Sequence, residues 1–257
     1  PMPGQISEPQ LHYWLVLLVF VLAAQTFILL FWVNAPYGRF ARDGWGPTIP
    51  ARTAWVLFES PAVVVFAAVY FAGRFAWELA PLVLFAAWQF HYLVRTLVYP
   101  LRMRDTGRRI PAVIVAMAVL FNVLNAYVNA RWISHLGHYA NDWLTSAPFL
   151  AGLALFLTGW VINQHADRAL LRLREPGETG YSIPQGGLYR YVSSPNYFGE
   201  ILEWAGWAVM TWSLAGLAFA VFTVANLLPR ALATHRWYRR RFPDYPPARR
   251  AIIPFLV

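Results

Sequence analysis

Residues 181–204, YSIPQGGLYRYVSSPNYFGEILEW, form a polar loop broken by glycine and proline that passes directly into an apolar segment, 201–228. Asn196, Glu200 and Glu203 fall on the first turns of that segment. Their i, i+4, i+7 spacing places them on one face of a helix. Because carboxylates at the mouth of a membrane helix are costly, the pattern indicates a functional site there.

The composition is that of an integral membrane protein. The chain has 257 residues, of which 58% are hydrophobic and 13% charged, against about 25% charged in a soluble domain. We expect one integral-membrane domain over residues 1–257. The polar start lacks a basic region, which argues against a cleaved signal peptide. The absence of cysteine excludes disulfides and thiol catalysis.

Seven apolar segments are long enough, or nearly so, to cross a bilayer. The sequence therefore predicts an all-α, polytopic bundle of seven transmembrane helices. The last two segments are short and are joined by a tight turn at residues 211–213. The predicted spans are 11–33, 53–73, 79–101, 111–133, 146–170, 197–212 and 214–232.

Arginine placement predicts the orientation of the bundle. All 21 basic residues are arginine. With the N-terminus outside, only Arg74 and Arg131 fall on the outer side, so the positive-inside rule places the C-terminus in the cytoplasm. Topology accounts for the +9 charge better than a nucleic-acid partner does. The arginine-only basic set is typical of a GC-rich genome, and we expect a bacterial inner membrane.

Glu59 and Tyr92 form the first candidate constellation. Counted at 1.5 Å per residue, they lie about 10 and 13 Å below the same cytoplasmic face, on consecutive spans. A carboxyl and a phenol that meet at this depth could polarise a carbonyl oxygen. A structural hydrogen bond between the two helices explains the pair equally well.

The second constellation joins the ends of two other spans. Asn163 and Asp167 have i, i+4 spacing, as do Asn196 and Glu200, and a short loop connects the two helices. With Arg174, these groups suit the hydroxyls, amide and phosphates of a nucleotide, although no Gly-x-Gly-x-x-Gly motif follows a strand. The alternative is a polar network that stitches the bundle together.

The C-terminal tail, residues 235–246, interleaves arginine with aromatic residues. His235 and Tyr238 in this tail could help to clamp an adenine and its phosphates. A basic segment lying on anionic lipid is the competing interpretation. We predict no metal site, because His135 and His138 lack the spacing and partners of known ligand sets.

Several of these segments resemble the steroid 5-alpha-reductase family. The similarity is nearly continuous from residue 163 onward, with further patches at 50–61, 91–92 and 95–99. The motifs that carry it are NQHAD at 163–167, REPGE at 174–178, IPQGGL at 183–188, NYFGE at 196–200, FPDYP at 242–246 and RRAIIPF at 249–255.

The resemblance implies a seven-helix reductase that takes NADPH from the cytoplasmic side and a hydrophobic 3-oxo-delta-4 steroid from the bilayer. Glu59 and Tyr92 would hold the substrate carbonyl while hydride passes to the beta carbon, and no obligate protein partner is evident. Tyr37 and Arg39 would reach the adenosine end. The other implied positions are Asn163, Asp167, Arg174, Tyr181, Asn196, Glu200, Tyr238 and Arg249 for the cofactor, and Trp55 and Phe121 for the substrate.

Two residues depart from the family pattern. Phe58 stands where glutamine usually precedes the catalytic glutamate, which would affect substrate choice or the orientation of Glu59. Ser182 replaces a usual arginine and removes a positive charge near the cofactor. Two other classes stay open: a membrane methyltransferase of the isoprenylcysteine type, which needs S-adenosylmethionine, and a seven-helix receptor or transporter without a nucleotide.

Overall fold

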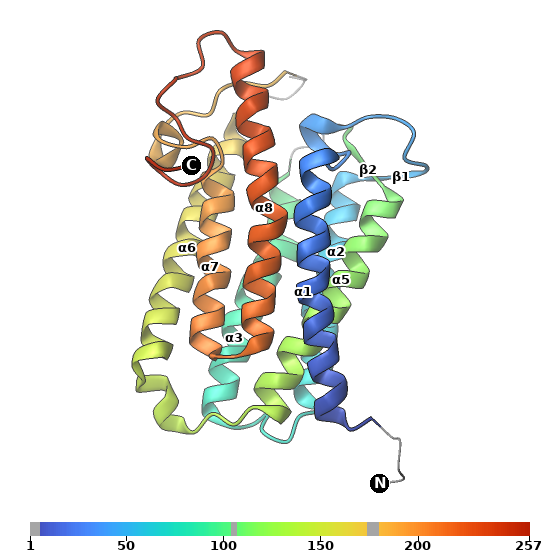
Figure 1. Ribbon diagram of the computed structural model, residues 1–257, viewed down its shortest axis with the longest axis vertical. Coiled ribbons are helices and arrows are strands. Elements are labelled where there is room, and N and C mark those ends of the chain that lie inside the picture. The colour runs from blue at the N-terminus through green and yellow to red at the C-terminus, as the bar shows by residue number, and fades with distance from the viewer. Residues whose placement is uncertain (1–5, 104–106, 174–179) are drawn as a thin grey trace.

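The structure, a computed structural model, describes residues 6–103, 107–173 and 180–257 and is predominantly helical. Its long helices run side by side and alternate in direction between the two ends of the molecule (Figure 1). They are α1 (Glu8–Trp32), α2 (Ala51–Phe71), α3 (Leu79–Leu93), α5 (Ala112–Arg131), α6 (Ala147–Arg172), α7 (Pro195–Thr211) and α8 (Leu214–Arg241).

Two of these helices continue through a π-helical turn. The segment Val94–Val98 joins α3 to the short helix α4 (Tyr99–Arg102), and Trp132–Leu136 extends α5. A two-stranded antiparallel ribbon, β1 (Thr48–Pro50) with β2 (Arg109–Pro111), lies at the end of the molecule where α8 finishes (Figure 1). Short 3-10 turns occur at Gly38–Phe40, Asn141–Thr145 and Gly187–Arg190.

Six helical segments within the described ranges are long and apolar enough to cross a membrane, so the prediction of a polytopic helical membrane protein is confirmed. Helix α7 has 17 residues and is not among them, although it runs antiparallel beside α8. The six segments are Glu8–Trp32, Ala51–Phe71, Leu79–Arg102, Ala112–Leu136, Ala147–Arg172 and Leu214–Arg241.

The prediction that the last helix is short was wrong. Helix α8 has 28 residues and continues to Arg241, so His235 and Tyr238, assigned to a tail after the last span, lie on that helix itself. Two physical causes extend it. The three arginines of its last turn face the negative end of the helix dipole, and the ring of Tyr238 is buried.

The predicted turn between the last two helices is confirmed. Trp212 adopts a left-handed conformation with φ of 44°, which ends α7. Ser213 then caps α8, because its side chain accepts a hydrogen bond from the backbone N–H of Gly216 at 2.9 Å.

Glycines set the unusually close approach of α6 and α7. A Cβ atom on Gly159 would lie 2.3 Å from the backbone nitrogen of Glu203, and one on Gly199 would lie 2.5 Å from that of Asn163. Small residues at a helix–helix contact let the two backbones touch. As a result, the polar residues of α6 and α7 face one another at short range.

The C-terminal segment is tied to the loop before α7. Ser193 donates its backbone N–H to the carbonyl of Arg250 at 2.9 Å, and Arg250 donates to that of Tyr191 at 2.8 Å. The Ser193 hydroxyl also lies 2.6 Å from both Nδ1 of His235 and the hydroxyl of Tyr245. These contacts fix the entry to α7 and leave His235 in a structural contact.

Candidate functional site

Arg95 is the centre of a buried charge cluster. Its Nη1 donates to Oδ2 of Asp167 at 3.0 Å, its Nη2 donates to Oε2 of Glu200 at 3.4 Å, and its Nε lies 3.6 Å from Oε1 of Glu59. The guanidinium also lies over the ring of Trp55, 4.6 Å from its centroid. One arginine therefore links α2, α6 and α7 from the end of α3.

The π-helical turn explains how one side chain makes these contacts. Arg95 lies in the segment Val94–Val98, where the α-helical hydrogen-bonding pattern is interrupted. Such turns change the direction of the side chains they carry and are frequent at functional sites. Sequence analysis missed Arg95 as a site residue, although its motif was part of the family resemblance.

The two predicted amide–carboxylate pairs meet. The side-chain amide of Asn163 donates to the carbonyl of Asn196 at 3.1 Å and to Oε2 of Glu200 at 3.3 Å. Asn196 in turn donates to Oδ1 of Asp167 at 3.1 Å. The prediction that these four residues lie close together is confirmed, and they form one network with Arg95.

Tyr92 lies beside this cluster, one helical turn before Arg95 on α3. Its side chain is buried, and its ring packs against those of Trp88 and Trp204, with centroids 4.9 and 5.5 Å away. The carboxyl of Glu59 lies 3.6 Å from Nε of Arg95, three residues along the chain from Tyr92. The structure thus brings Glu59 and Tyr92 to one buried region, as predicted.

The helix around Glu59 carries an interruption of its own. Pro61 lies inside α2 and cannot donate the backbone hydrogen bond that the Leu57 carbonyl would otherwise accept. The hydroxyl of Ser60 donates to that carbonyl at 3.0 Å instead. On the neighbouring α5, Asn122 donates its side-chain amide to the carbonyl of Phe58 at 2.5 Å.

The predicted substrate residues lie in two places. Trp55 and Phe58 pack against each other with ring centroids 4.9 Å apart, next to Arg95. Phe121 lies on α5 and stacks on Phe222 of α8, 3.6 Å between centroids. Trp55 and Phe58 are therefore close to the charge cluster, whereas Phe121 belongs to the contact between α5 and α8.

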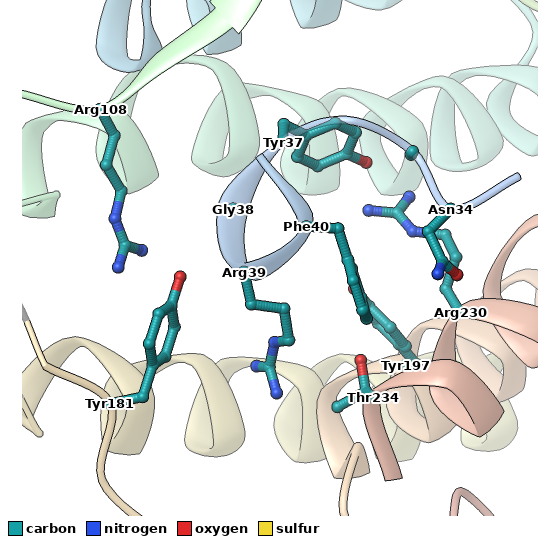
Figure 2. A pocket seen from close by; sticks show the side chains of 11 residues that line it. Asn34, Tyr37, Gly38, Arg39, Phe40, Arg108, Tyr181, Tyr197, Arg230 and Thr234 are labelled. Carbon is teal, nitrogen blue, oxygen red and sulfur yellow. The ribbon is translucent and has the colours of Figure 1, made fainter. Parts of the chain in front are cut away.

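A separate cavity of about 150 Å³ opens near the ends of α1 and α8. The guanidinium of Arg39 lies 4.7 Å from the ring centroid of Tyr238 and 5.8 Å from that of Tyr181. Figure 2 shows Arg108 and Tyr181 pointing toward one another across it. Its lining residues are Asn34, Ala35, Tyr37, Gly38, Arg39, Phe40, Arg108, Tyr181, Tyr197, Arg230 and Thr234.

The donors of this cavity fit an anionic ligand. Arg39, Arg108 and Arg230 all line it, and Nη1 of Arg39 is buried with no hydrogen-bond partner among the described residues. Burial raises the pKa of Tyr37, while the positive charge of Arg230 acts in the opposite direction. The Tyr37 phenol therefore stays protonated at neutral pH and remains a hydrogen-bond donor.

Arg249 and Arg174 are two further predicted cofactor residues, and Arg249 is not among the described residues that line the cavity. Arg249 is buried, and it donates to the carbonyl of Pro184 at 3.0 Å and to the side chain of Gln185 at 2.9 Å. It anchors the loop that follows Gly180. Arg174 lies outside the described residues.

Comparison with known proteins decides the family. A family profile described as 3-oxo-5-alpha-steroid 4-dehydrogenase matches residues 108–257. The chain is 45% identical over 255 residues to "Steroid 5-alpha-reductase DET2" of Gossypium hirsutum, covering 97% of this chain and 99% of the relative. The chain belongs to the steroid 5-alpha-reductase family.

Animal relatives show the same relationship. The human "3-oxo-5-alpha-steroid 4-dehydrogenase 1" is 45% identical over 230 residues, covering 87% of this chain and 86% of the relative. The rat protein of that name is 45% identical over 227 residues, covering 88% of this chain and 87% of the relative. Membership assigns the chain to a family of oxidoreductases, and not to the methyltransferases, receptors or transporters considered above.

Two cavity residues of this 5-alpha-reductase family member were missed as site residues by sequence analysis. Arg108 and Arg230 were interpreted only as determinants of topology, because each lies among other arginines near the end of an apolar segment. What marks these two arginines is their contact with aromatic rings on distant segments, and only the folded structure shows it. Arg108 lies 5.0 Å from the ring centroid of Tyr181, and Arg230 lies 4.8 Å from that of Tyr37.

Proposed function

We propose that this protein reduces the delta-4 double bond of a 3-oxo-delta-4 steroid, or of a similar hydrophobic enone, with NADPH as the hydride donor. The observation that carries the proposal is the cluster around Arg95, which brings Glu59, Asp167 and Glu200 together beside Tyr92. The family relationship supplies the reaction class.

Glu59 and Tyr92 hold the substrate carbonyl in this proposal. Hydride addition to the beta carbon of an enone moves negative charge onto the carbonyl oxygen. A phenol and a protonated carboxyl aimed at that oxygen stabilise the charge most strongly where water is excluded. The side chain of Tyr92 is buried, and that of Glu59 is only 11% exposed, so both groups are in such a place.

The residues present fit NADPH. The guanidinium groups of Arg39, Arg108 and Arg230 suit its phosphates, and the rings of Tyr181 and Trp237, which flank Arg39, suit a purine. When bound, NADPH supplies the hydride. The arginine-rich cavity further predicts a preference for NADPH over NADH, because a 2′-phosphate pairs well with a guanidinium.

The charge balance of the Arg95 cluster also supports a role for these residues in NADPH-dependent reduction. Three carboxyl groups, those of Glu59, Asp167 and Glu200, face the single guanidinium of Arg95. This negative excess favours the protonated form of Glu59 that would donate to the substrate carbonyl, and it would suit a cofactor that gains positive charge when it gives up a hydride. Asn163 and Asn196 hold the other two carboxylates in place.

We also propose that the chain crosses a bacterial inner membrane seven times as one unit, with the N-terminus outside. The alternating direction of seven helical passes supports this count, although α7 is short (Figure 1). Seventeen residues span about 25 Å, which is near the thickness of a hydrocarbon core. The arginine-rich cavity then faces the cytoplasm, where NADPH is made.

Activity assays of the purified protein test the proposal. Progesterone or testosterone is supplied with NADPH in liposomes, and the saturated ketone is followed by mass. Tyr92→Phe and Glu59→Ala each remove a carbonyl partner, which typically costs about 100- to 1,000-fold in rate. NADPH binding, followed by its absorbance, should persist in both variants. Turnover near the parental rate in both would show that the carbonyl is held elsewhere.

A further inference from the structure

A second ionisable pair lies deeper in the bundle than the Arg95 cluster. Nδ1 of His91 lies 2.7 Å from Oε1 of Glu203, and the two side chains are 5% and 0% exposed. Glu203 follows Glu200 by one turn on α7, and His91 directly precedes Tyr92 on α3. The pair therefore connects α3, which carries Tyr92, to α7, which carries Glu200.

Burying this ionisable pair costs desolvation free energy, and the hydrogen bond between His91 and Glu203 offsets only part of it. Oε2 of Glu203 is buried with no hydrogen-bond partner among the described residues. A buried polar group left unpaired costs free energy. The backbone of Glu203 packs directly on Gly159 of α6, where an added Cβ would lie 2.3 Å from the Glu203 nitrogen, so Glu203 is held at a tight helix contact. An ionisable pair held at such a position in a membrane protein indicates a function.

Aromatic contacts connect the pair to Tyr92. The ring of Trp204, the residue after Glu203, lies 4.6 Å from the His91 ring and 5.5 Å from the Tyr92 ring, centroid to centroid. Trp88 packs against both Trp204 and Tyr92, at 5.3 and 4.9 Å. A shift of His91 relative to Glu203 would therefore move the rings that enclose Tyr92.

The π-helical turn makes the contact between His91 and Glu203 more important for the position of Tyr92. It begins at Val94, two residues after Tyr92, so the backbone beyond Tyr92 lacks the regular α-helical hydrogen bonds. The contact of His91 with Glu203 holds α3 to α7 immediately before that interruption.

We propose that His91 and Glu203 are positioning residues for the reduction: their hydrogen bond sets the place of the Tyr92 phenol relative to the substrate carbonyl. The inference rests on the proposed function of Tyr92. It predicts that loss of the pair lowers kcat more than it raises KM, because binding of the apolar substrate and of NADPH depends on other residues.

The test compares His91→Leu and Glu203→Leu with His91→Asn. Each leucine removes the hydrogen bond of the pair, and a displacement of about 1 Å at a reacting group can cost about 100-fold in rate. We expect a 10- to 100-fold loss of kcat on this basis, with the dissociation constant of NADPH changed less than about twofold. Asparagine places an amide nitrogen where Nδ1 of His91 lies, so His91→Asn keeps a donor to Glu203 and should retain most of the parental kcat.

Tyr70→Phe is the matched control. Tyr70 is also fully buried, and its hydroxyl donates to the carbonyl of Ala76 at 2.8 Å. It lies eleven residues after Glu59, near the far end of α2. This variant removes a buried hydrogen bond away from the site, so it should lower the melting temperature but leave kcat nearly unchanged. The same result for His91→Leu and Glu203→Leu would overturn the proposal and assign the pair a structural role.

Failure of the proposed function would look different. In that case Tyr92→Phe itself would turn over the steroid at the parental rate. A slow Tyr92→Phe enzyme together with fully active His91→Leu and Glu203→Leu variants would reject only the positioning role. If the leucine variants do not fold, Glu203→Asp decides, because its shorter side chain withdraws the carboxylate from His91: a kcat at least about 10-fold below the parental value supports the positioning role, and an unchanged kcat rejects it.

Discussion

At the scale of single residues, Arg95 contacts three carboxyl groups of the site. It compensates Glu59, Asp167 and Glu200, and its own side chain is 12% exposed. Removing one partner of a buried ion pair leaves the other charge uncompensated, which typically costs about 3 to 5 kcal/mol. Asp167 and Glu200 would both lose the guanidinium that pairs with them, and Glu59 would lose the guanidinium beside it.

We therefore expect Arg95→Gln to lower the free energy of unfolding by about 3 kcal/mol or more and to abolish NADPH binding. Thermal unfolding in detergent, followed by tryptophan fluorescence, measures the first effect. Arg102→Gln, at the exposed end of α4 in the same span, is the control and should unfold with the parental midpoint. Equal midpoints for all three proteins would contradict the central role of Arg95.

Arg39 allows a second prediction at this scale. Its guanidinium lies among the rings of Tyr181, Trp237 and Tyr238, and Nη1 is buried without a partner in the described part of the chain. Loss of a charge-assisted hydrogen bond to phosphate costs about 1.5 to 3 kcal/mol, so Arg39→Ala should raise the dissociation constant of NADPH at least about 10-fold.

A neighbouring arginine supplies the control for Arg39. Arg42 is exposed and donates to the carbonyl of Asn34, but its own side chain is not among the described ones that line the cavity. Arg42→Ala should change the dissociation constant less than about twofold, because exposed charges are screened. If both variants bind NADPH equally, the cavity around Arg39 does not hold the cofactor.

What the sequence could predict at this scale depended on local spacing. Asn163, Asp167, Asn196 and Glu200 were predicted to meet because i, i+4 pairs sit at the facing ends of two consecutive helices. Arg95 was missed because its reach depends on a π-helical turn, which no local pattern specifies. The pairing of His91 with Glu203 was missed because 112 residues separate them.

At the scale of elements, the contact between α6 and α7 positions the site. Gly152 and Gly159 on α6 face Gly199 and Gly206 on α7, and a Cβ on any of them would lie within 2.5 Å of the opposite backbone. The close contact brings the amide of Asn163 within hydrogen-bond distance of Glu200. Loosening this contact should separate the network without removing any of its members.

We expect Gly159→Ala to destabilise the protein by about 1 to 3 kcal/mol and to weaken NADPH binding, because an added methyl group forces the two backbones apart. The melting temperature and the dissociation constant measure these effects. Gly180→Ala is the control, since no atom of the described residues lies within 4 Å of its added Cβ. A Gly159→Ala protein as stable as Gly180→Ala would show that the helices adjust freely.

Element lengths were harder to predict than element types. Hydropathy located the helices, but it ended the last one near residue 232, where arginines become frequent. The structure continues α8 to Arg241, because the rings of Trp237 and Tyr238 pack around Arg39 of a distant loop. Hydropathy measures affinity for lipid, and it contains no information on the tertiary contacts that stabilise a helix beyond the membrane.

At the scale of the whole molecule, the distribution of arginine and the path of the chain point to one topology. The cavity of Arg39, Arg108 and Arg230 lies at the end of the bundle where α8 finishes. The start of α1 and the turn at Trp212 lie at the other end (Figure 1). The short α7 is the only pass whose crossing of the membrane the composition leaves undecided within the described residues.

The chain contains no cysteine, so single introduced cysteines report topology without background. We expect Asp142→Cys and Trp212→Cys to react with a membrane-impermeant maleimide in intact cells, since both side chains are exposed at the outer end. Asp43→Cys and Asp244→Cys, exposed near the arginine-rich end, should react only after permeabilisation. Trp212→Cys is the decisive position, because it marks the turn between α7 and α8. If α7 does not cross and the other six spans do, Trp212→Cys will react only after permeabilisation, like Asp43→Cys, whereas Asp244→Cys will react in intact cells. The NADPH site must then be placed on a six-span protein.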